Sequence, residues 1–234
     1  MKYITLFEQQ TAFDNAKSTL DKPNMSLVTE TGNVYSLAVG GGVTYEYVDL
    51  GLPSRLKWAK CNVGAEKETD AGLYFAWGET TGYTASQVGT DKHFSLSEYK
   101  YWNSNLTKYI QSDGKTVLDP EDDAASQIMG EGWRMPTETE IRELINNTTN
   151  EWATINGVNG RKFTGSNGNS IFIPAAGDCS DGSVDSVGNG GYVWSSSLYT
   201  SYPNLAWGLY FDSGDCSMSS DGRYYGQSVR GVRK

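Results

Sequence analysis

The chain has 234 residues, of which 28 are acidic and 19 basic, so its formal net charge is −9. This acidic balance argues against nucleic-acid binding, which requires a basic face, and we expect no nucleic-acid partner. No run approaches the roughly 18 apolar residues of a membrane span. The length suits one large domain with a small appendage. The three scattered cysteines form neither a disulfide framework nor a metal-binding motif, so we expect no cofactor and no metal.

Residues 1–42 form a separate small unit by their pattern. The start, MKYITLFEQQ, has no charged region followed by an apolar core, so we expect no signal peptide and synthesis in the cytoplasm. Thr11 can cap a helix that runs to Leu20. Two short strands, at 26–29 and 34–37, are joined by a hairpin signal, and glycines 40–42 then provide a flexible link. Two interpretations remain open: an anchoring or oligomerising module, or a strand pair of the main domain.

The main domain is expected over residues 43–234. Short strands are predicted at 45–50, 56–59 and 73–78, and the polar stretch 79–118 is predicted to be a long loop.

Two helices are predicted after this loop. The first opens with Asp119 as the N-cap and Pro120 at the first helical position. The second begins at Thr137, where Glu140 completes a capping box ahead of an apolar stripe that includes Ile141.

Three turn dipeptides follow these helices, at Asn156-Gly157, Asn159-Gly160 and Asn167-Gly168. They bracket two short apolar segments, 162–164 and 171–173, that read as strands. Together these elements predict an α+β fold with two helices and short, irregular antiparallel strands, plus the small N-terminal module.

The segment 191–234 interleaves two kinds of residue. Trp194, Leu209, Phe211, Val229 and Val232 are expected to form a framework. Tyrosine offers a large, rigid contact area, while Ser, Gly and Asn offer adaptable hydrogen bonds, as in antibody paratopes. The predicted ligand-contacting residues are Tyr199, Tyr202, Asn204, Gly208, Tyr210, Asp212, Gly214, Asp215, Ser217, Ser220, Asp221, Gly222, Tyr224 and Tyr225. This composition favours recognition over catalysis.

Strand alternation supports the same division. Over residues 208–212, Leu209 and Phe211 would point into the core, whereas Gly208, Tyr210 and Asp212 would point outward. We therefore expect the predicted contact residues to share one solvent-facing side of a sheet.

Catalytic alternatives are weak. Cys179 and Cys216 are the C-terminal thiols, and His93 lies in a polar loop with no matched nucleophile beside it in the sequence, so we expect no catalytic residue. The acids at 121–123 suit the first turn of a helix better than a calcium loop. Arg223, Arg230 and Arg233 are expected to pair with framework carboxylates, with direct ligand contact by Arg223 as the alternative.

A chain of longer motifs resembles a known family. These are YEYVDLGLPSRLKWAKCNVGA (45–65), GLYFAWGE (72–79), LDPEDDAA (118–125), GEGWRMPTETEIRELI (130–145), INGVNGRKFTGSNGNSIFIPAAG (155–177) and the C-terminal pattern that ends in SVRGVR. They are similar to the Fibrobacter succinogenes major paralogous domain, which is abundant in Bacteroides and their phages. The resemblance implies a C-type lectin fold of the formylglycine-generating-enzyme-like branch.

Members of this fold serve as variable proteins of diversity-generating retroelements, in which adenines of a C-terminal segment are mutated. Adenine changes in AAC or AAT codons reach Tyr, Ser, Asp, Asn and Gly but not Trp, Gln or Met. The 14 predicted contact residues belong to the reachable set, whereas Trp207, Met218 and Gln227 do not and are expected to be fixed.

The resemblance implies a virion-associated receptor-binding or adhesion protein of a Bacteroides phage, with a protein or glycan receptor on a cell surface. Residues 1–42 would attach it to a particle or make it a homo-oligomer. The alternatives are a non-diversified Bacteroides surface or envelope domain with a fixed glycan or protein ligand and, third, an enzyme of the formylglycine-generating type that uses Cys179 or Cys216.

Overall fold

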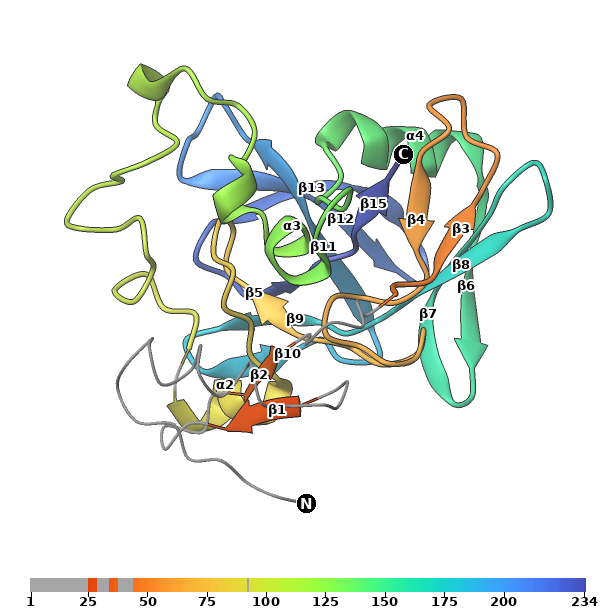
Figure 1. Cartoon of the computed structure of the whole chain (residues 1–234), viewed down its shortest axis with the longest axis horizontal. Helices are drawn as coiled ribbons and strands as arrows, with labels where there is room; N and C mark the ends of the chain where they lie inside the picture. The colour runs from red at the N-terminus through yellow and green to blue at the C-terminus, as the bar shows by residue number, and fades with distance from the viewer. Residues whose placement is uncertain (1–24, 29–33, 38–43, 92) are drawn as a thin grey trace. The chain divides into compact units, whose positions relative to one another are not determined.

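The computed structural model describes residues 25–28, 34–37, 44–91 and 93–234 of the chain (Figure 1). The chain divides into two compact units, Met1–Thr44 and Tyr45–Lys234. In the first unit, β1 (Met25–Val28) pairs antiparallel with β2 (Val34–Leu37), which confirms the two predicted strands. The expected helix at 11–20, the hairpin turn and the glycine link lie outside the described residues.

The second unit is a mixed α+β structure, mostly strands with few helices, as expected in outline. Its main sheet has the order β13-β12-β11-β14-β5, and smaller sheets have the orders β15-β4-β3, β6-β7-β8 and β10-β9. The strands are β3 (Tyr47–Asp49), β4 (Lys57–Ala59), β5 (Tyr74–Phe75), β6 (Thr149–Ile155), β7 (Val158–Thr164), β8 (Ser170–Pro174), β9 (Asp178–Ser180), β10 (Ser183–Asp185), β11 (Gly190–Leu198), β12 (Leu205–Asp212), β13 (Cys216–Gly222), β14 (Gln227–Ser228) and β15 (Val232–Arg233).

The helix predicted from Thr137 is confirmed as α4 (Glu138–Asn147). Thr137 Oγ1 accepts a hydrogen bond from the Glu140 amide at 3.3 Å, and the Glu140 carboxylate accepts one from the Thr137 amide at 2.8 Å. This reciprocal capping box satisfies two amides that a helix start otherwise leaves without partners. Ile141 and Leu144 are buried, so the predicted stripe faces the core.

The helix predicted at residue 120 begins later than expected. Pro120–Asp122 form only a 3₁₀ turn (η2), and α3 (Ala124–Met129) is capped by Asp123, whose Oδ1 accepts from the Ser126 amide at 2.9 Å. Asp119 makes no capping bond because its carboxylate pairs with Lys108 at 3.0 Å and with Lys115.

The stretch 79–118 is not wholly a loop. It contains α2 (Ala85–Asp91) and a 3₁₀ turn, η1 (Gln111–Asp113). The described part of the second unit therefore has three α-helices where two were predicted. None of the described helices is long and apolar enough to cross a membrane.

Two of the three predicted turns are confirmed. Asn156 and Gly157 have φ angles of 50° and 81° and join β6 to β7, as a two-residue hairpin loop requires. The turn at Asn167-Gly168 joins β7 to β8. The turn predicted at Asn159-Gly160 is wrong, because both residues lie inside β7. Gly160 is instead required by the close packing of β7 on β8, because a Cβ there would lie 2.3 Å from the Ile173 carbonyl oxygen.

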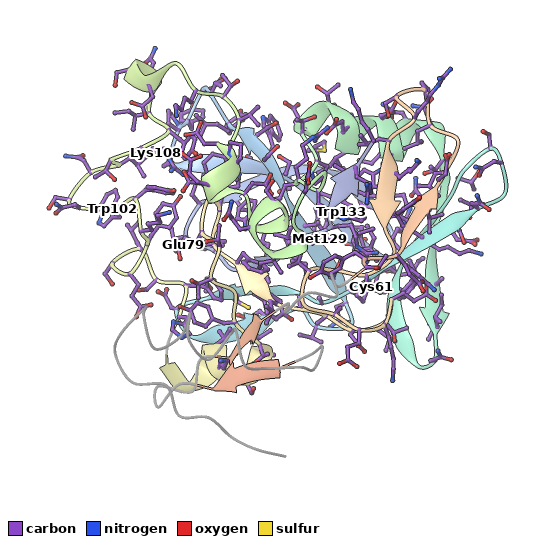
Figure 2. All side chains as sticks on the ribbon, in the orientation of Figure 1. Cys61, Glu79, Trp102, Lys108, Met129 and Trp133 are labelled. Carbon is purple, nitrogen blue, oxygen red and sulfur yellow. The ribbon has the colours of Figure 1, made fainter. Side chains whose placement is uncertain are left out.

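The core consists of two buried clusters. Met129 and Trp133, labelled in Figure 2, belong to the first. Both lie against Gly231, where a Cβ would be 2.5 Å from the Met129 sulfur and 3.1 Å from the Trp133 ring. The second includes Ile141 of α4, which lies against β11, β12 and β13. The five expected framework residues are confirmed as buried, each at most 1% exposed: Trp194, Leu209, Phe211, Val229 and Val232.

Candidate ligand-binding surface

The two faces of β12 differ sharply in their surroundings. Leu209 and Phe211 are buried in the second core cluster, whereas Tyr210 is half-buried and faces the opposite side. Cross-strand pairing places Tyr192 of β11 and Ser217 of β13 beside Tyr210. The Tyr192 and Tyr210 rings have centroids 5.1 Å apart. We call this side, the one opposite α4, the outer face.

The outer face gathers five of the predicted contact residues and adds two that the sequence did not indicate. Within the paired strands these are Gly208, Tyr210, Asp212, Ser217 and Asp221, together with Tyr192 and Ser219. Tyr192 was missed because alternation along β11 groups it with the buried Trp194. Trp194 is buried in the first core cluster, where its indole N–H donates to the Phe75 carbonyl oxygen of β5 at 2.8 Å, whereas Tyr192 is half-buried.

Acidic groups surround Tyr192. Burial first, and then the charges of Asp178 and Asp221, raise the pKa of Tyr192. Burial is also the main reason that the pKa of Asp178 rises to about 6, with Asp221 and Asp185 adding repulsion. Burial raises the pKa of Asp221 as well. Among the described ion pairs, none includes Asp178, Asp185 or Asp221.

The turn after β12 has its own hydrogen-bond network. The Asp212 carboxylate accepts from the Tyr210 hydroxyl and from the amides of Gly214 and Asp215, each at 2.7 Å. These bonds, the first of them foremost, lower the pKa of Asp212. Ser217 Oγ donates to Asp215 at 2.7 Å. Asp212 therefore shapes the turn, whereas Gly214 and Asp215 are exposed at its tip.

Not all predicted contact residues share the outer face, which corrects the expectation of one common side. Ser220 pairs with Trp207, and both lie on the α4 side because side chains alternate along each strand. The Trp207 ring lies 5.5 Å from the Arg142 guanidinium of α4 and 4.6 Å from the Tyr199 ring. Tyr199 in turn stacks on Tyr202 at 5.9 Å.

The loop that carries Tyr199 and Tyr202 forms a second exposed aromatic group. Tyr202 is 61% exposed, and Asn204 of the same loop is exposed. The Asn204 carbonyl oxygen accepts from the Arg223 amide at 3.2 Å. This loop therefore lies next to the chain segment that follows β13.

Tyr224 and Tyr225 follow β13 and pack edge to face, with centroids 4.7 Å apart. Burial first, and then Tyr225, raises the pKa of Tyr224 to about 12. A Cβ on Gly222 would lie 3.0 Å from the Tyr224 ring. Gly208 is similarly enclosed, with the Val193 carbonyl oxygen at 3.0 Å from such an atom, and it is buried rather than exposed as expected.

Arg223 contradicts both expectations for it. It is 1% exposed and pairs with no carboxylate in the described structure. Its guanidinium instead donates to the Tyr99 hydroxyl and to the carbonyl oxygens of Lys108, Tyr109 and Pro203. The guanidinium carbon also lies 4.9–5.8 Å from four aromatic ring centroids, those of Trp77, Tyr99, Tyr101 and Tyr109. Aromatic rings and carbonyl oxygens thus replace the carboxylate that a buried cation usually needs.

The other two arginines behave in the same way. Arg230 is fully buried and donates to the Asn62 side chain and to the carbonyl oxygens of Ala59, Lys60 and Phe172, and its burial lowers its pKa to about 10. Arg233 lies over the Tyr47 and Trp133 rings, at 5.5 Å and 5.3 Å. The expected arginine–carboxylate pairs are therefore replaced by contacts with carbonyl oxygens, an amide and aromatic rings.

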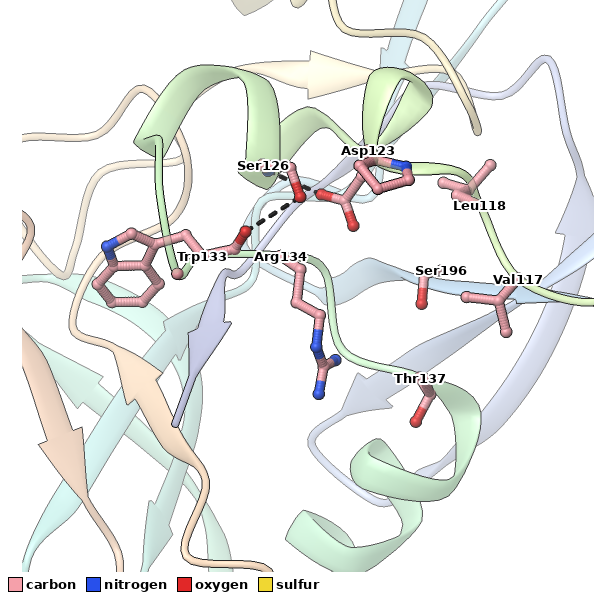
Figure 3. Close-up of a pocket in the computed structure, with 10 residues that line it drawn as sticks. Val117, Leu118, Asp123, Ser126, Trp133, Arg134, Thr137 and Ser196 are labelled. Carbon is pink, nitrogen blue, oxygen red and sulfur yellow. Dashed lines mark hydrogen bonds between the residues drawn. The ribbon is translucent and has the colours of Figure 1, made fainter.

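A separate cavity of about 370 Å³ lies between η2, α3 and the start of α4 (Figure 3). Its volume is within the usual range for ligand pockets, about 300–1,000 Å³. Its polar groups already serve the fold. Asp123 accepts from the Ser126 and Met135 amides, and Arg134 forms a two-point ion pair with Glu140. The cavity is thus built from capping and helix-packing contacts.

Three clustered acids and the two C-terminal thiols lie apart from the outer face or beneath it, each with contacts of its own. Asp119, Glu121 and Asp122 lie close together, but Lys108 contacts all three and Lys100 also pairs with Asp122. Burial raises the pKa of the Cys179 thiol and that of Cys216, the latter to about 11. Both thiols are therefore protonated at neutral pH, and only a thiolate is a competent nucleophile.

No family model, curated protein or solved structure matches the chain.

Proposed function

We propose that residues 45–234 form a C-type lectin-like ligand-binding domain whose C-terminal surface is diversified by a retroelement. The domain serves as a receptor-binding or adhesion protein of a Bacteroides phage and is carried on the virion. The observation that supports this most directly is the division of β12 and β13. Framework residues such as Leu209 and Phe211 are buried on one face, and Tyr210 and Ser217 lie on the other.

This division is what a diversified protein needs. Replacing Tyr210 or Ser217 removes no atom from the apolar clusters, because neither residue belongs to them. Substitutions on a surface away from core contacts usually change stability by no more than about 0.5 kcal/mol. Such a surface can vary while the scaffold below it persists. Tyrosine-rich surfaces of this kind bind protein and glycan receptors alike.

A fixed ligand surface of a Bacteroides envelope domain is the second candidate, and specific observations favour it at some positions. Asp212 holds the turn through three hydrogen bonds, and Gly208 and Gly222 leave little room for side chains. Free variation at these three positions would damage the scaffold. The diversified surface we propose therefore excludes them and consists mainly of Tyr199, Tyr202, Asn204, Tyr210, Gly214, Asp215, Ser217, Ser220 and Asp221. It also includes Tyr224 and Tyr225, which pack partly against the first core cluster.

An enzyme of the formylglycine-generating type receives little support. Cys179 belongs to the first core cluster, while Cys216 packs against the second, so the two thiols serve different parts of the core. Substituting either one would then affect stability, not an activity.

The deciding experiment is deep sequencing of the coding region for 191–234 across a population that carries the gene. Diversification predicts variation at positions such as Tyr210, Ser217 and Tyr224, with Trp194 and Leu209 constant. A search beside the gene for a reverse transcriptase and a near-copy of this segment provides the control. A uniform sequence with neither element would exclude diversification and favour the fixed-ligand alternative.

We further propose that residues 1–42 attach the domain to a particle or make it an oligomer. Light scattering of the full chain, compared with a chain that starts at residue 43, measures the second role. Monomers in both cases would rule out oligomerisation through this segment.

A further inference from the structure

The outer face around Tyr192 carries acidic groups that form no ion pair with any of the described residues. Bridges join Gly177 to Gly191 and Cys179 to Gly226, which places Asp178 between β11 and the start of β14, and Asp185 pairs with Asp178 in the β9–β10 register. Gln227 of β14 in turn bonds to Asp221. Two partly buried acids elsewhere do have such partners, since Asp122 contacts two lysines and Glu140 contacts Arg134. The buried Asp123 has backbone amides as donors instead. Half-buried carboxylates of like charge are unfavourable unless a cation joins them. The arrangement therefore resembles one half of an ion pair.

An independent observation at the same place concerns Gln227, which is 1% exposed. Its Nε2 donates to the Asp221 carboxylate at 2.9 Å, which fixes the orientation of the amide. Its Oε1 is buried and has no hydrogen-bond partner among the described residues. Oε1 lies against Gly208 on the outer face, 3.1 Å from where a Cβ would stand. A buried acceptor without a donor costs about 1–3 kcal/mol, so the site favours a ligand that brings donors.

The aromatic groups match the same chemistry. Tyr192 and Tyr210 lie side by side across the strands, and tyrosine rings attract cations through their faces. Arg161 of β7 contacts the turn that follows β12. Its guanidinium donates a hydrogen bond to the backbone carbonyl oxygen of Asp212, not to the Asp212 carboxylate. Arg161 forms no ion pair with Asp178 or Asp221 among the described residues.

We infer that the outer face at Tyr192, Asp178 and Asp221 binds a guanidinium group, presented as an arginine side chain by a protein partner. This inference rests on the proposed function, because it specifies the ligand that the surface takes in this sequence. Asp178 and Tyr192 lie outside the positions proposed to vary, whereas Asp221 belongs to them. A guanidinium offers five donors in a planar fork, which suits two carboxylates and one amide oxygen, and it stacks on tyrosine. An ammonium lacks this geometry, and a neutral glycan leaves the repulsion between the carboxylates in place.

The test uses the full chain and a labelled hexa-arginine peptide at near-physiological salt, with binding followed by fluorescence anisotropy. We expect saturable binding that the double substitution Asp178→Asn and Asp221→Asn weakens about tenfold or more. The control, Glu66→Gln with Glu131→Gln, removes the same charge from exposed positions outside this face and should change affinity by no more than about twofold. Circular dichroism melting checks that both variants fold, and neither substitution removes a packed apolar group.

Three results would overturn the inference: no saturable binding, an equal loss in the control pair, or displacement of the peptide by calcium chloride at low millimolar concentration. An equal loss would mean that binding follows net charge alone, and displacement would indicate a metal site. Hexa-lysine binding as tight as hexa-arginine would refute the guanidinium preference. Failure here leaves the population sequencing unaffected, so the ligand class and the diversification are tested separately.

Discussion

Replacing Arg223 should reveal how far the proposed surface depends on the scaffold beneath it. Arg223 lies between Gly222 and Tyr224, within the segment proposed to vary, yet its guanidinium is buried among residues of two distant segments. It donates four hydrogen bonds, to a tyrosine hydroxyl and three carbonyl oxygens. Arg223→Met removes all four and leaves buried acceptors without donors.

The size of the effect follows from these contacts. Four hydrogen bonds at a net value of about 1 kcal/mol each contribute about 4 kcal/mol. The apolar methionine, which carries no charge to desolvate, recovers about 1 kcal/mol. We therefore expect the free energy of unfolding to fall by about 3 kcal/mol. For a domain of this size, that corresponds to a decrease of about 6–12 °C in the melting temperature.

Urea denaturation followed by tryptophan fluorescence and circular dichroism measures this change. Arg223→Lys keeps the charge but loses the planar fork, so it should be destabilised to a similar degree. The control is Lys67→Met at an exposed position, which should stay within about 0.5 kcal/mol of the unchanged protein. If Arg223→Met matched that control, the carbonyl and aromatic cage would not be what holds this segment, and the reasoning would be wrong.

Three further predictions concern separate elements. Thr137→Ala removes the capping hydroxyl of α4 and should lower the free energy of unfolding by about 1 kcal/mol in urea titration; an unchanged midpoint would contradict the capping role. Burial raises the pKa of Asp178 in the folded state from 3.8 to about 6, so the folded protein keeps this proton at a pH where the unfolded chain has lost it. The resulting contribution to the free energy of unfolding is present below pH 3.8 and is lost as the pH rises from 3.8 to about 6. Asp178→Asn should flatten this decline in melting temperature between pH 4 and about pH 7, and an equally steep decline would refute the assignment. Gly208→Ala places a methyl group 3.0 Å from the Val193 carbonyl oxygen and should cost about 1–3 kcal/mol. Gly214→Ala, with 3.6 Å of clearance, should cost less than about 0.5 kcal/mol; equal urea midpoints for the two would show that the space at Gly208 is not limiting.

Local chemistry accounts for the expectations that were confirmed. The capping box at Thr137 and the Asn156-Gly157 turn depend on atoms within a few residues of each other. The local sequence is therefore enough to predict both. The burial of Leu209 and Phe211 on one face of β12 follows from strict alternation along a strand. These features predicted the α+β class and the polarity of the C-terminal sheet.

Expectations failed where other residues, not all of them distant in the chain, compete for a local group. Asp119 makes no capping bond because Lys108 and Lys115 bind its carboxylate. The Asn159-Gly160 dipeptide forms no turn, since Gly160 is required for close contact with β8. In each case a local preference of about 1 kcal/mol or less is outweighed by an interaction that the sequence does not display.

The sequence by itself determined which residues are apolar framework and which are polar contact candidates, because alternation and composition depend on the residue types alone. Only the tertiary structure decided which candidates meet. It separates Ser220 from Tyr210 through strand pairing, and the bridge between Gly177 and Gly191 brings the segments of Asp178 and Tyr192 together. It also buries Arg223 in an aromatic cage. Register and burial arise from contacts between residues far apart in the chain, and no local pattern records them.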